Sequence, residues 1–407
     1  MSDGTAIEWT DATWNPIVGC SIASHGCKIC YAMKLAGSRL KNTPERKGLT
    51  IDTKAGPVWN GEVRFIDKWL DQPLRWKRPR KIFVCAHGDL FHESVPDAWI
   101  DKVFAVMALS PQHTFQVLTK RAKRMREYLT DRLTPFHRIH YDAAADFGRV
   151  KWGWIRDRAP KHMAITEYNL YLQVPWPLPN VWLGVSAEDQ KHADERVPEL
   201  LATPAAVRFV SAEPLVGPID FLRWAPTMRP AKRAGTGEPF LAPQYFMTRC
   251  EHCGWFGSSE LCQLAQYHDD ADVLCPSCKE IFLCDEVDTR LDWIIAGGES
   301  GAGARPMHPA WARAIRDQCT AAGVAFFFKL WGEWAPGDWS FDLDDCLHFA
   351  PDDKRIRVFP LNSRSVDRME WSDGERSPEG AGFLRVGKKA AGRLLDGKEH
   401  SAFPEAR

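Results

Sequence analysis

Six short apolar runs recur along this chain of 407 residues, and each run ends in polar residues. Near-continuous apolar runs of this length are typical of buried parallel strands. Helical segments lie between several of them, at 97–109, 310–322 and, with a weaker pattern, 188–201. This alternation predicts an α/β fold with a partial or complete TIM-like β/α barrel. The six runs are residues 81–87, 114–118, 180–185, 206–210, 292–296 and 323–328.

Charged residues stand at or just past the ends of these predicted strands. In a β/α barrel such ends meet at one rim, where binding and catalytic residues gather. Arginine and lysine there would suit a carboxylate or phosphate group, although each residue taken alone could equally form a surface salt bridge. We predict catalytic roles for Asp89, His92, Lys120 and Glu213, and substrate binding by Arg121, Glu188, Arg305 and Lys329.

A loop near the start of the chain contains Cys20, Cys27 and Cys30 with the spacing C-x6-C-x2-C. Three thiolates can bind three irons of a [4Fe–4S] cluster, and the fourth iron is then open to a small molecule. Two alternatives remain at this stage. The three cysteines could bind zinc together with His25 or a remote residue, or they could be a redox pair and a bystander.

A second cysteine group has the pattern C-x2-C-x21-C-x2-C, which is the spacing of a zinc ribbon. Tetrahedral zinc needs four soft ligands, and two C-x2-C turns supply them in pairs. Such a closed site has no open position for chemistry, so we expect a structural or recognition role. Cys262 and Cys284 are spare, and either could replace a ligand. The four predicted zinc ligands are Cys250, Cys253, Cys275 and Cys278.

These features predict a barrel that is interrupted by an inserted zinc-ribbon module. The predicted parts are a first barrel part at 1–223, with the cysteine loop at 14–32 and a peripheral insertion at about 127–179, then the zinc-ribbon module at 224–290, the last barrel strands at 291–334 and a C-terminal extension at 335–407.

The composition narrows the classes of protein that fit. Lys+Arg and Asp+Glu both number 53, which argues against a wholly basic nucleic-acid coat but allows a local patch. We see no signal peptide and no apolar stretch long enough to span a bilayer. Half of the twelve cysteines stand in C-x2-C pairs. They are therefore expected to be metal ligands and free thiols in a reducing, cytoplasmic compartment.

The cysteine loop resembles the cluster loop of the radical S-adenosylmethionine (SAM) superfamily. That superfamily's usual spacing is C-x3-C-x2-C, and here only the last gap is kept. More closely, the chain is similar to uncharacterised phage and prophage proteins with a G-C-x6-C-x2-C-Y-A motif. Segments at the predicted strand ends also match that family.

The resemblance implies that SAM would chelate the open iron and be cleaved reductively, with an electron donor as partner. Gly297, Gly298 and Glu299 resemble the glycine-rich segment that contacts the SAM amino group in that superfamily. A simple glycine turn at the exit of a strand explains the same residues equally well.

Three functions are consistent with the sequence. The first is a radical SAM-type enzyme that modifies a nucleic-acid base or a nucleotide. The second is a zinc-binding, nucleic-acid-binding or regulatory protein with no SAM chemistry. The third is a hydrolase that uses Asp89, His92 and Glu213. Iron and sulfide would favour the first, and about two zinc ions per chain would favour the second.

Overall fold

The computed structural model describes residues 5–138, 146–147, 150–151, 177–233, 237–265, 272–284, 286–287, 289–336, 356–359 and 381–405. These residues divide into two compact units. The first holds the chain up to Ser186 together with Glu199–Phe209, and the second holds Ala187–Pro198 and the chain from Val210 to Pro404. Most of the predicted insertion at 127–179 and much of the predicted extension at 335–407 lie outside the described residues.

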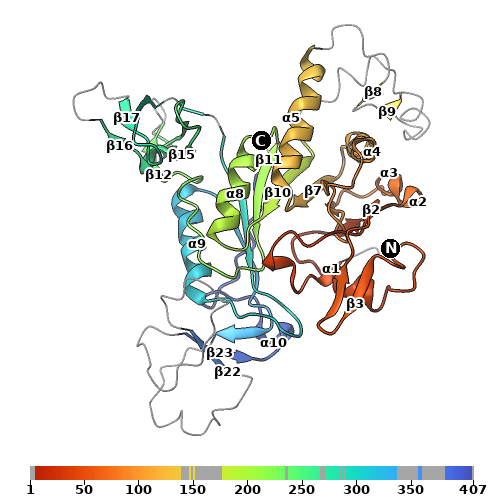
Figure 1. Ribbon diagram of the computed structural model, residues 1–407. Helices are drawn as coiled ribbons and strands as arrows, with labels where there is room; N and C mark the ends of the chain where they lie inside the picture. Colours follow the sequence, from red (N-terminus) through yellow and green to blue (C-terminus); the bar gives the residue numbers. More distant parts are fainter. Residues whose placement is uncertain are drawn as a thin grey trace, which may run out of the picture. The chain divides into compact units, whose positions relative to one another are not determined.

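Seven strands form the main sheet. They are β1 (Ala12–Trp14), β6 (Lys81–Val84), β7 (Thr114–Thr119), β10 (Val181–Ser186), β11 (Val207–Ala212), β19 (Trp293–Gly297) and β20 (Ala325–Leu330). Their order in the sheet is β1-β6-β7-β10-β11-β19-β20, and Figure 1 labels β7, β10 and β11. The pairs β1·β6, β6·β7, β7·β10 and β19·β20 are parallel.

The strand order follows the chain order, as in a β/α barrel, whereas a doubly wound sheet reverses its order at a switch point. In the described part of the chain, β1 and β20 each have one neighbour in this sheet. The fold is therefore mixed α/β with an open parallel sheet, which is compatible with the partial form of the predicted barrel.

The burial of the strands explains why the apolar runs were nearly continuous. Every residue of β10 and of β19 is buried, so neither strand shows the alternation of a half-exposed strand. Gly184 makes room for a neighbouring ring, because a Cβ there would lie 2.4 Å from Cζ of Phe209. In the first unit, Trp14 packs against Phe115 with 5.7 Å between the ring centroids.

The described helices are α1 (Tyr31–Gly37), α2 (Asp67–Leu70), α3 (Gln72–Arg75), α4 (Asp97–Ala108), α5 (Ala122–Arg138), α8 (Gln190–Leu201), α9 (Pro309–Ala322) and α10 (Lys388–Ala391). Three of them, α4, α8 and α9, lie close to the predicted ranges 97–109, 188–201 and 310–322. None of the described helices combines the length and the apolar character that crossing a membrane requires.

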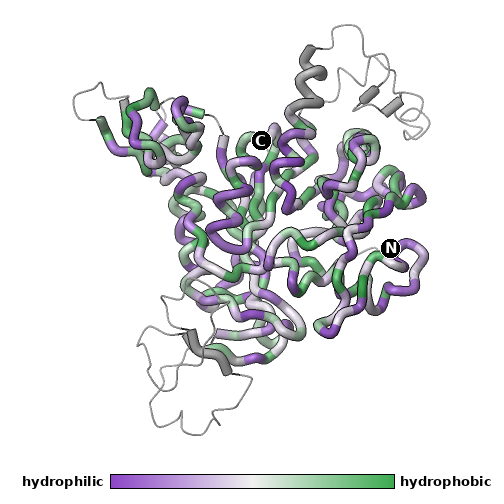
Figure 2. Tube along the Cα trace, in the orientation of Figure 1, coloured by the Kyte–Doolittle hydropathy of each residue, from purple (hydrophilic) through white to green (hydrophobic). Residues whose placement is uncertain are grey.

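Helix α9 shows how local sequence fixes an element. The Nδ1 atom of His308 accepts a hydrogen bond from the backbone N–H of Ala310 at 3.1 Å and caps the first turn. Gly323, with φ +63°, ends the helix in the left-handed conformation. Figure 2 shows hydrophobic and hydrophilic colours alternating along this helix. Its apolar side contacts β19 and β20.

Small antiparallel sheets complete the described structure. They are β2 (Ile17–Val18) with β5 (Arg64–Phe65), β3 (Thr50–Thr53) with β4 (Gly56–Trp59), β8 (Asp146–Phe147) with β9 (Val150–Lys151), β12 (Met228–Lys232) with β13 (Pro239–Pro243), β14 (Met247–Arg249) with β15 (Phe256–Ser258), β16 (Gln263–Leu264) with β17 (Asp272–Leu274) and β18 (Ile281–Leu283), and β23 (Ala381–Arg385) with β21 (Trp334–Pro336) and β22 (Ile356–Phe359).

Candidate functional site

The cysteine loop begins at a fixed point beside the end of β6. Gly19 follows β2 with φ +92°, and a Cβ there would lie 2.2 Å from the carbonyl oxygen of Glu62. Only glycine meets both conditions. The N–H of Gly19 donates to the carbonyl of His87 at 3.1 Å, and Gly19 also pairs with Gly88 in an isolated parallel bridge. The backbone therefore directs the loop toward the carboxyl end of β6.

The three thiols of the loop are neighbours but are not in mutual contact. Among the described residues, two groups of possible metal ligands have all ligand atoms within 4.8 Å of one another, and Cys20, Cys27 and Cys30 do not form such a group. Burial raises the pKa of Cys20 to about 12, and Asp89, Cys30 and Cys27 add to the increase. Burial also raises the pKa of Cys30. A metal that binds here would displace protons from these thiols.

Arg121, just past β7, joins this loop to the adjoining strand ends. Its Nη1 donates to Sγ of Cys20 at 3.5 Å and to Oδ2 of Asp89 at 3.2 Å. Its Nη2 donates to the hydroxyl of Ser21 at 2.7 Å and to the carbonyl of Ser21 at 3.2 Å. Its Nε lies 3.3 Å from a carboxylate oxygen of Glu93. The guanidinium of Arg121 thus contacts Cys20 and Ser21 of the loop and the carboxylates of Asp89 and Glu93.

Asp89 is buried, and other groups of the protein occupy both of its carboxylate oxygens. Oδ1 accepts the backbone N–H of Phe91 at 3.0 Å and the hydroxyl of Thr119 at 2.7 Å. Oδ2 accepts the backbone N–H of Lys120 at 3.2 Å together with Arg121. Asp89 therefore positions Arg121, and its oxygens are not directed at a substrate.

His92 also contacts the loop. Its Nδ1 accepts the N–H of Ser94 at 3.1 Å, so the ring proton of the neutral form lies on Nε2, which donates to the hydroxyl of Ser21 at 2.8 Å. Burial lowers the pKa of His92, and Arg121 lowers it further. The imidazole is therefore neutral at pH 7 and acts as a donor toward the loop.

The structure thus brings Asp89, His92, Arg121 and the backbone of Lys120 together with the cysteine loop. Five other predicted site residues, Glu188, Glu213, Glu299, Arg305 and Lys329, belong to the second unit and form ion pairs there. Glu213 pairs with Lys329 at 2.9 Å, and both side chains are partly exposed. Glu188 is fully buried and pairs with Arg196 at 2.9 Å.

Glu299 and Arg305 are the remaining predicted pair. Nε and Nη2 of Arg305 contact the two carboxylate oxygens of Glu299 at 3.0 and 2.9 Å, and both side chains are buried. The backbone N–H of Arg305 also donates to Oε2 of Glu299 at 2.9 Å. This bidentate pair occupies the carboxylate that was predicted to contact an amino group.

Gly297 and Gly298 have a packing role in this turn. A Cβ on Gly298 would lie 2.0 Å from the carbonyl oxygen of Trp331, and one on Gly297 would lie 2.6 Å from Oε1 of Glu213. The N–H of Gly298 donates to the carbonyl of Leu330 at 2.9 Å. Close approach of a backbone explains Gly298, and close approach of the Glu213 side chain explains Gly297.

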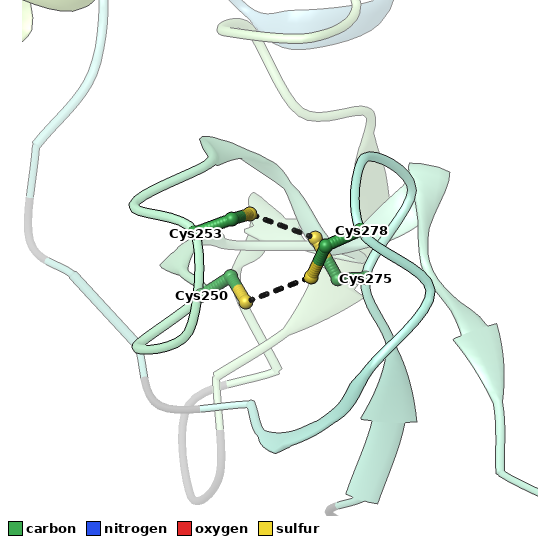
Figure 3. A group of neighbouring side chains, drawn as sticks. All are labelled: Cys250, Cys253, Cys275 and Cys278. Atoms are coloured by element: carbon green, nitrogen blue, oxygen red, sulfur yellow. Dashed lines mark hydrogen bonds between the residues drawn. The ribbon is translucent and has the colours of Figure 1, made fainter.

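The four cysteines of the second group do come together (Figure 3). The sulfurs of Cys250 and Cys278 are 3.8 Å apart, and those of Cys253 and Cys275 are 3.6 Å apart. A tetrahedral zinc site with bonds of about 2.3 Å places its sulfurs about 3.8 Å apart. The geometry therefore suits a single metal ion held by four thiolates.

The two C-x2-C turns have the same local structure. Gly254 and Lys279 follow the turns with φ +73° and +64°. Their N–H groups donate to the carbonyls of Cys250 and Cys275 at 2.9 and 3.0 Å. A hydrogen bond from the backbone of Trp255 lowers the pKa of Cys253, which is exposed. Both turns are thus shaped to present two sulfurs to one ion.

Sequence reasoning missed Ser21 and Glu93 as parts of the first site. Each stands next to a predicted residue in the sequence, Ser21 after Cys20 and Glu93 after His92, and this adjacency was the available signal. His87, at the end of the predicted strand 81–87, has its Nδ1 2.9 Å from Nη2 of Arg46, from which it accepts a hydrogen bond.

Comparison with known proteins identifies a family but no function. A family model described as "Protein of unknown function (DUF5131)" matches residues 4–404. No curated protein and no solved structure matches the chain. The predicted kinship with the radical SAM superfamily and its phage branch is wrong, because the match that covers the chain is to this other family. The six-residue first gap of the cysteine motif was the departure that pointed away from that superfamily.

Proposed function

The chain belongs to this family of unknown function, and from the site itself we propose that it is an enzyme whose Cys20, Cys27 and Cys30 hold a [4Fe–4S] cluster. The observation that carries the proposal is the setting of the three thiols. They come from one loop, Cys27 and Cys30 lie near enough to Cys20 to raise its pKa, and Arg121 donates to Sγ of Cys20 at 3.5 Å. Three thiolates can bind three irons of a [4Fe–4S] cluster and leave the fourth iron open.

The surroundings of the loop also suit a cluster. Hydrogen bonds to the sulfurs and nearby charge tune such centres, and the guanidinium of Arg121 supplies both at Cys20. When bound, the cluster would supply single electrons from an external donor and an open iron for a chelating molecule, and SAM, which has an amine beside a carboxylate, is the first compound to test.

The protein's own groups would then hold and orient that molecule. Asp89 and Thr119 fix Arg121, and Arg121 in turn fixes Cys20 and Ser21. Glu93 is the exposed member of the set, with 67% of its side chain accessible and 3.3 Å from Arg121. We assign Glu93 to the contact with a positively charged part of the ligand.

The second metal centre is proposed to be a zinc ribbon on Cys250, Cys253, Cys275 and Cys278. Sulfur separations of 3.6 and 3.8 Å and two matching turns support it. Both centres need reduced thiols, and the described cysteines are free. A reducing, cytoplasmic compartment is therefore part of the proposal.

Anaerobic reconstitution with iron and sulfide tests the cluster. We expect about four irons and four sulfides per chain in addition to one zinc. The triple variant Cys20→Ser/Cys27→Ser/Cys30→Ser should lose the iron and keep the zinc, and Cys275→Ser is the matched control that should do the reverse. Zinc in both centres, with no iron taken up, would contradict the proposal and favour a zinc-binding regulatory protein.

The small-molecule ligand is tested separately on the reconstituted protein. SAM is added with dithionite, and 5′-deoxyadenosine and methionine are quantified. Their formation in the unmodified protein and not in the triple variant would support SAM as the ligand. If the cluster forms but SAM is neither bound nor cleaved, the proposal of a [4Fe–4S] cluster is retained and the proposal of SAM as its ligand is wrong.

A further inference from the structure

The β12–β13 hairpin concentrates positive charge in a segment that is otherwise acidic. Between residues 228 and 249 the chain has four cations and one carboxylate, Glu238. From 250 to 290 it has two cations and nine carboxylates. The positive charge is therefore local and does not reflect the composition of the whole segment. The four cations are Arg229, Lys232, Arg233 and Arg249.

The register of the hairpin gathers two arginines and an aromatic ring on one face. Side chains alternate along a strand, so Arg229, Ala231 and Arg233 share a face. Phe240 pairs directly with Ala231 and therefore lies on that face as well. The guanidinium of Arg233 is 5.7 Å from the centroid of the Phe240 ring. At about 3.4 Å per residue, the two arginines are about 14 Å apart along the strand, with the ring between them.

These side chains are accessible. Phe240 is 40% exposed, and Arg229, Lys232 and Arg233 are also exposed. No ion pair formed between described residues includes these three cations. The base of the hairpin is closed by a hydrogen bond from the N–H of Gln244 to the carbonyl of Thr227 at 3.1 Å. This face of the hairpin therefore presents exposed cations that form no ion pair with described residues.

We propose that this face binds single-stranded nucleic acid. The two guanidiniums would contact backbone phosphates, and Phe240 would stack on an unpaired base. An acidic peptide would satisfy the arginines but would leave the ring without a stacking partner, and a duplex would keep its bases out of reach. This inference rests on the proposed function and deepens it, because it names the substrate class of the enzyme.

The test is fluorescence anisotropy with the full chain and a labelled 20-nucleotide single strand of mixed sequence, at several salt concentrations. Arg229→Ala/Arg233→Ala should weaken binding at least about tenfold at low salt and reduce the slope of log affinity against log salt by about 1.4, since each phosphate contact on a single strand contributes about 0.7. Phe240→Ala should weaken binding at least about fivefold with the slope unchanged.

Matched controls separate this surface from general charge. Lys123→Ala/Lys191→Ala removes the same charge from two exposed helical positions and should leave affinity within about twofold. Heparin is a polyanion without bases. Its binding should be weaker in Arg229→Ala/Arg233→Ala and unchanged in Phe240→Ala. Zinc content is measured in each variant as a check on the fold of the module.

Three results would overturn the inference. These are no binding of the single strand, unchanged binding in both hairpin variants, and equal or tighter binding of a duplex of the same sequence. The triple serine variant of the cysteine loop distinguishes the two proposals, because it should bind the single strand normally even though it carries no iron. Loss of binding in that variant would place the nucleic-acid contact at the cysteine loop and would also refute the proposal that the hairpin binds the single strand.

Discussion

The buried ion pair between Arg121 and Asp89 gives a direct test of how the cysteine loop is held. The two side chains meet at 3.2 Å, and each is 6% exposed. The substitution Arg121→Met keeps most of the volume but leaves the carboxylate charged and unpaired. Breaking a buried pair in this way costs about 3–5 kcal/mol. Asp89 keeps three other donors, from Phe91, Thr119 and Lys120, so we expect a loss of about 3 kcal/mol.

The double variant Asp89→Asn/Arg121→Met separates charge from packing. It has no unpaired charge, so it should be more stable than Arg121→Met alone by about 1–2 kcal/mol. Since the two residues are in contact, their effects should not add, and the coupling free energy should reach about 2 kcal/mol. The stability of Arg121→Lys should lie between the stabilities of these two variants. A lysine ammonium cannot contact Cys20, Ser21 and Asp89 at the same time, as the planar guanidinium of arginine does.

Hydrogen exchange measured by mass spectrometry suits this prediction, because a chain with two units does not unfold in one step. In Arg121→Met, peptides that cover residues 82–95 and 115–125 should exchange about 150-fold faster, which corresponds to 3 kcal/mol. Peptides from α9 are the internal control. Two results would refute the reasoning. One is an unchanged exchange rate in Arg121→Met. The other is a double variant whose loss of stability equals the sum of the losses in Asp89→Asn and Arg121→Met.

Three further predictions concern other parts of the chain. Burial, with a smaller effect of the neighbouring guanidinium, lowers the pKa of His87 to about 4. The stabilisation by neutral His87 is therefore complete above about pH 6.5 and is lost as the pH falls toward 4. Thermal melts of His87→Gln should show a shallower loss of Tm across that window than the unmodified protein shows. Cys275→Ser should release one zinc per chain and expose residues 228–284 to limited proteolysis, whereas an intact zinc content would argue against a four-thiolate site. Gly298→Ala should speed hydrogen exchange of peptides that cover β19 and β20 by more than about 30-fold, which corresponds to about 2 kcal/mol, because its Cβ would lie 2.0 Å from the carbonyl oxygen of Trp331. Gly56→Ala has open space around it and strains only the backbone, whose φ is +113°; it should cost about 1 kcal/mol locally, and equal losses for the two glycines would contradict this argument.

The sheet was predictable because each strand carries its own signal. The run at 114–118 became β7 (Thr114–Thr119), and the run at 292–296 became β19 (Trp293–Gly297). Burial on both faces forces continuous apolar residues, and this pattern is local in the sequence. The parallel order also follows from alternation with helices. The open form of the sheet did not follow, since closure depends on strands far apart in the sequence.

The site was less predictable because the partner of a charged residue is not a local property. Arg121 and Asp89 were both predicted, but the sequence could not indicate that they pair with each other. Glu299 was predicted to contact a ligand, whereas Arg305 occupies both of its carboxylate oxygens. The four-cysteine group was found in full, because its ligand spacing is itself the structural requirement.

The order of the main sheet has a consequence for how the chain is made. Each strand is added beside the strand that left the ribosome before it. The wait between neighbouring strands is longest after β11, because 80 residues lie between Ala212 and Trp293, against 66 between Trp14 and Lys81 and 61 between Thr119 and Val181. At about 5–20 residues per second, the growing edge of β11 stays without its neighbour for roughly 4–16 seconds. An uncovered strand edge invites pairing with other chains. Nascent chains of this protein are therefore most vulnerable to aggregation while the cysteine-rich segment is being synthesised.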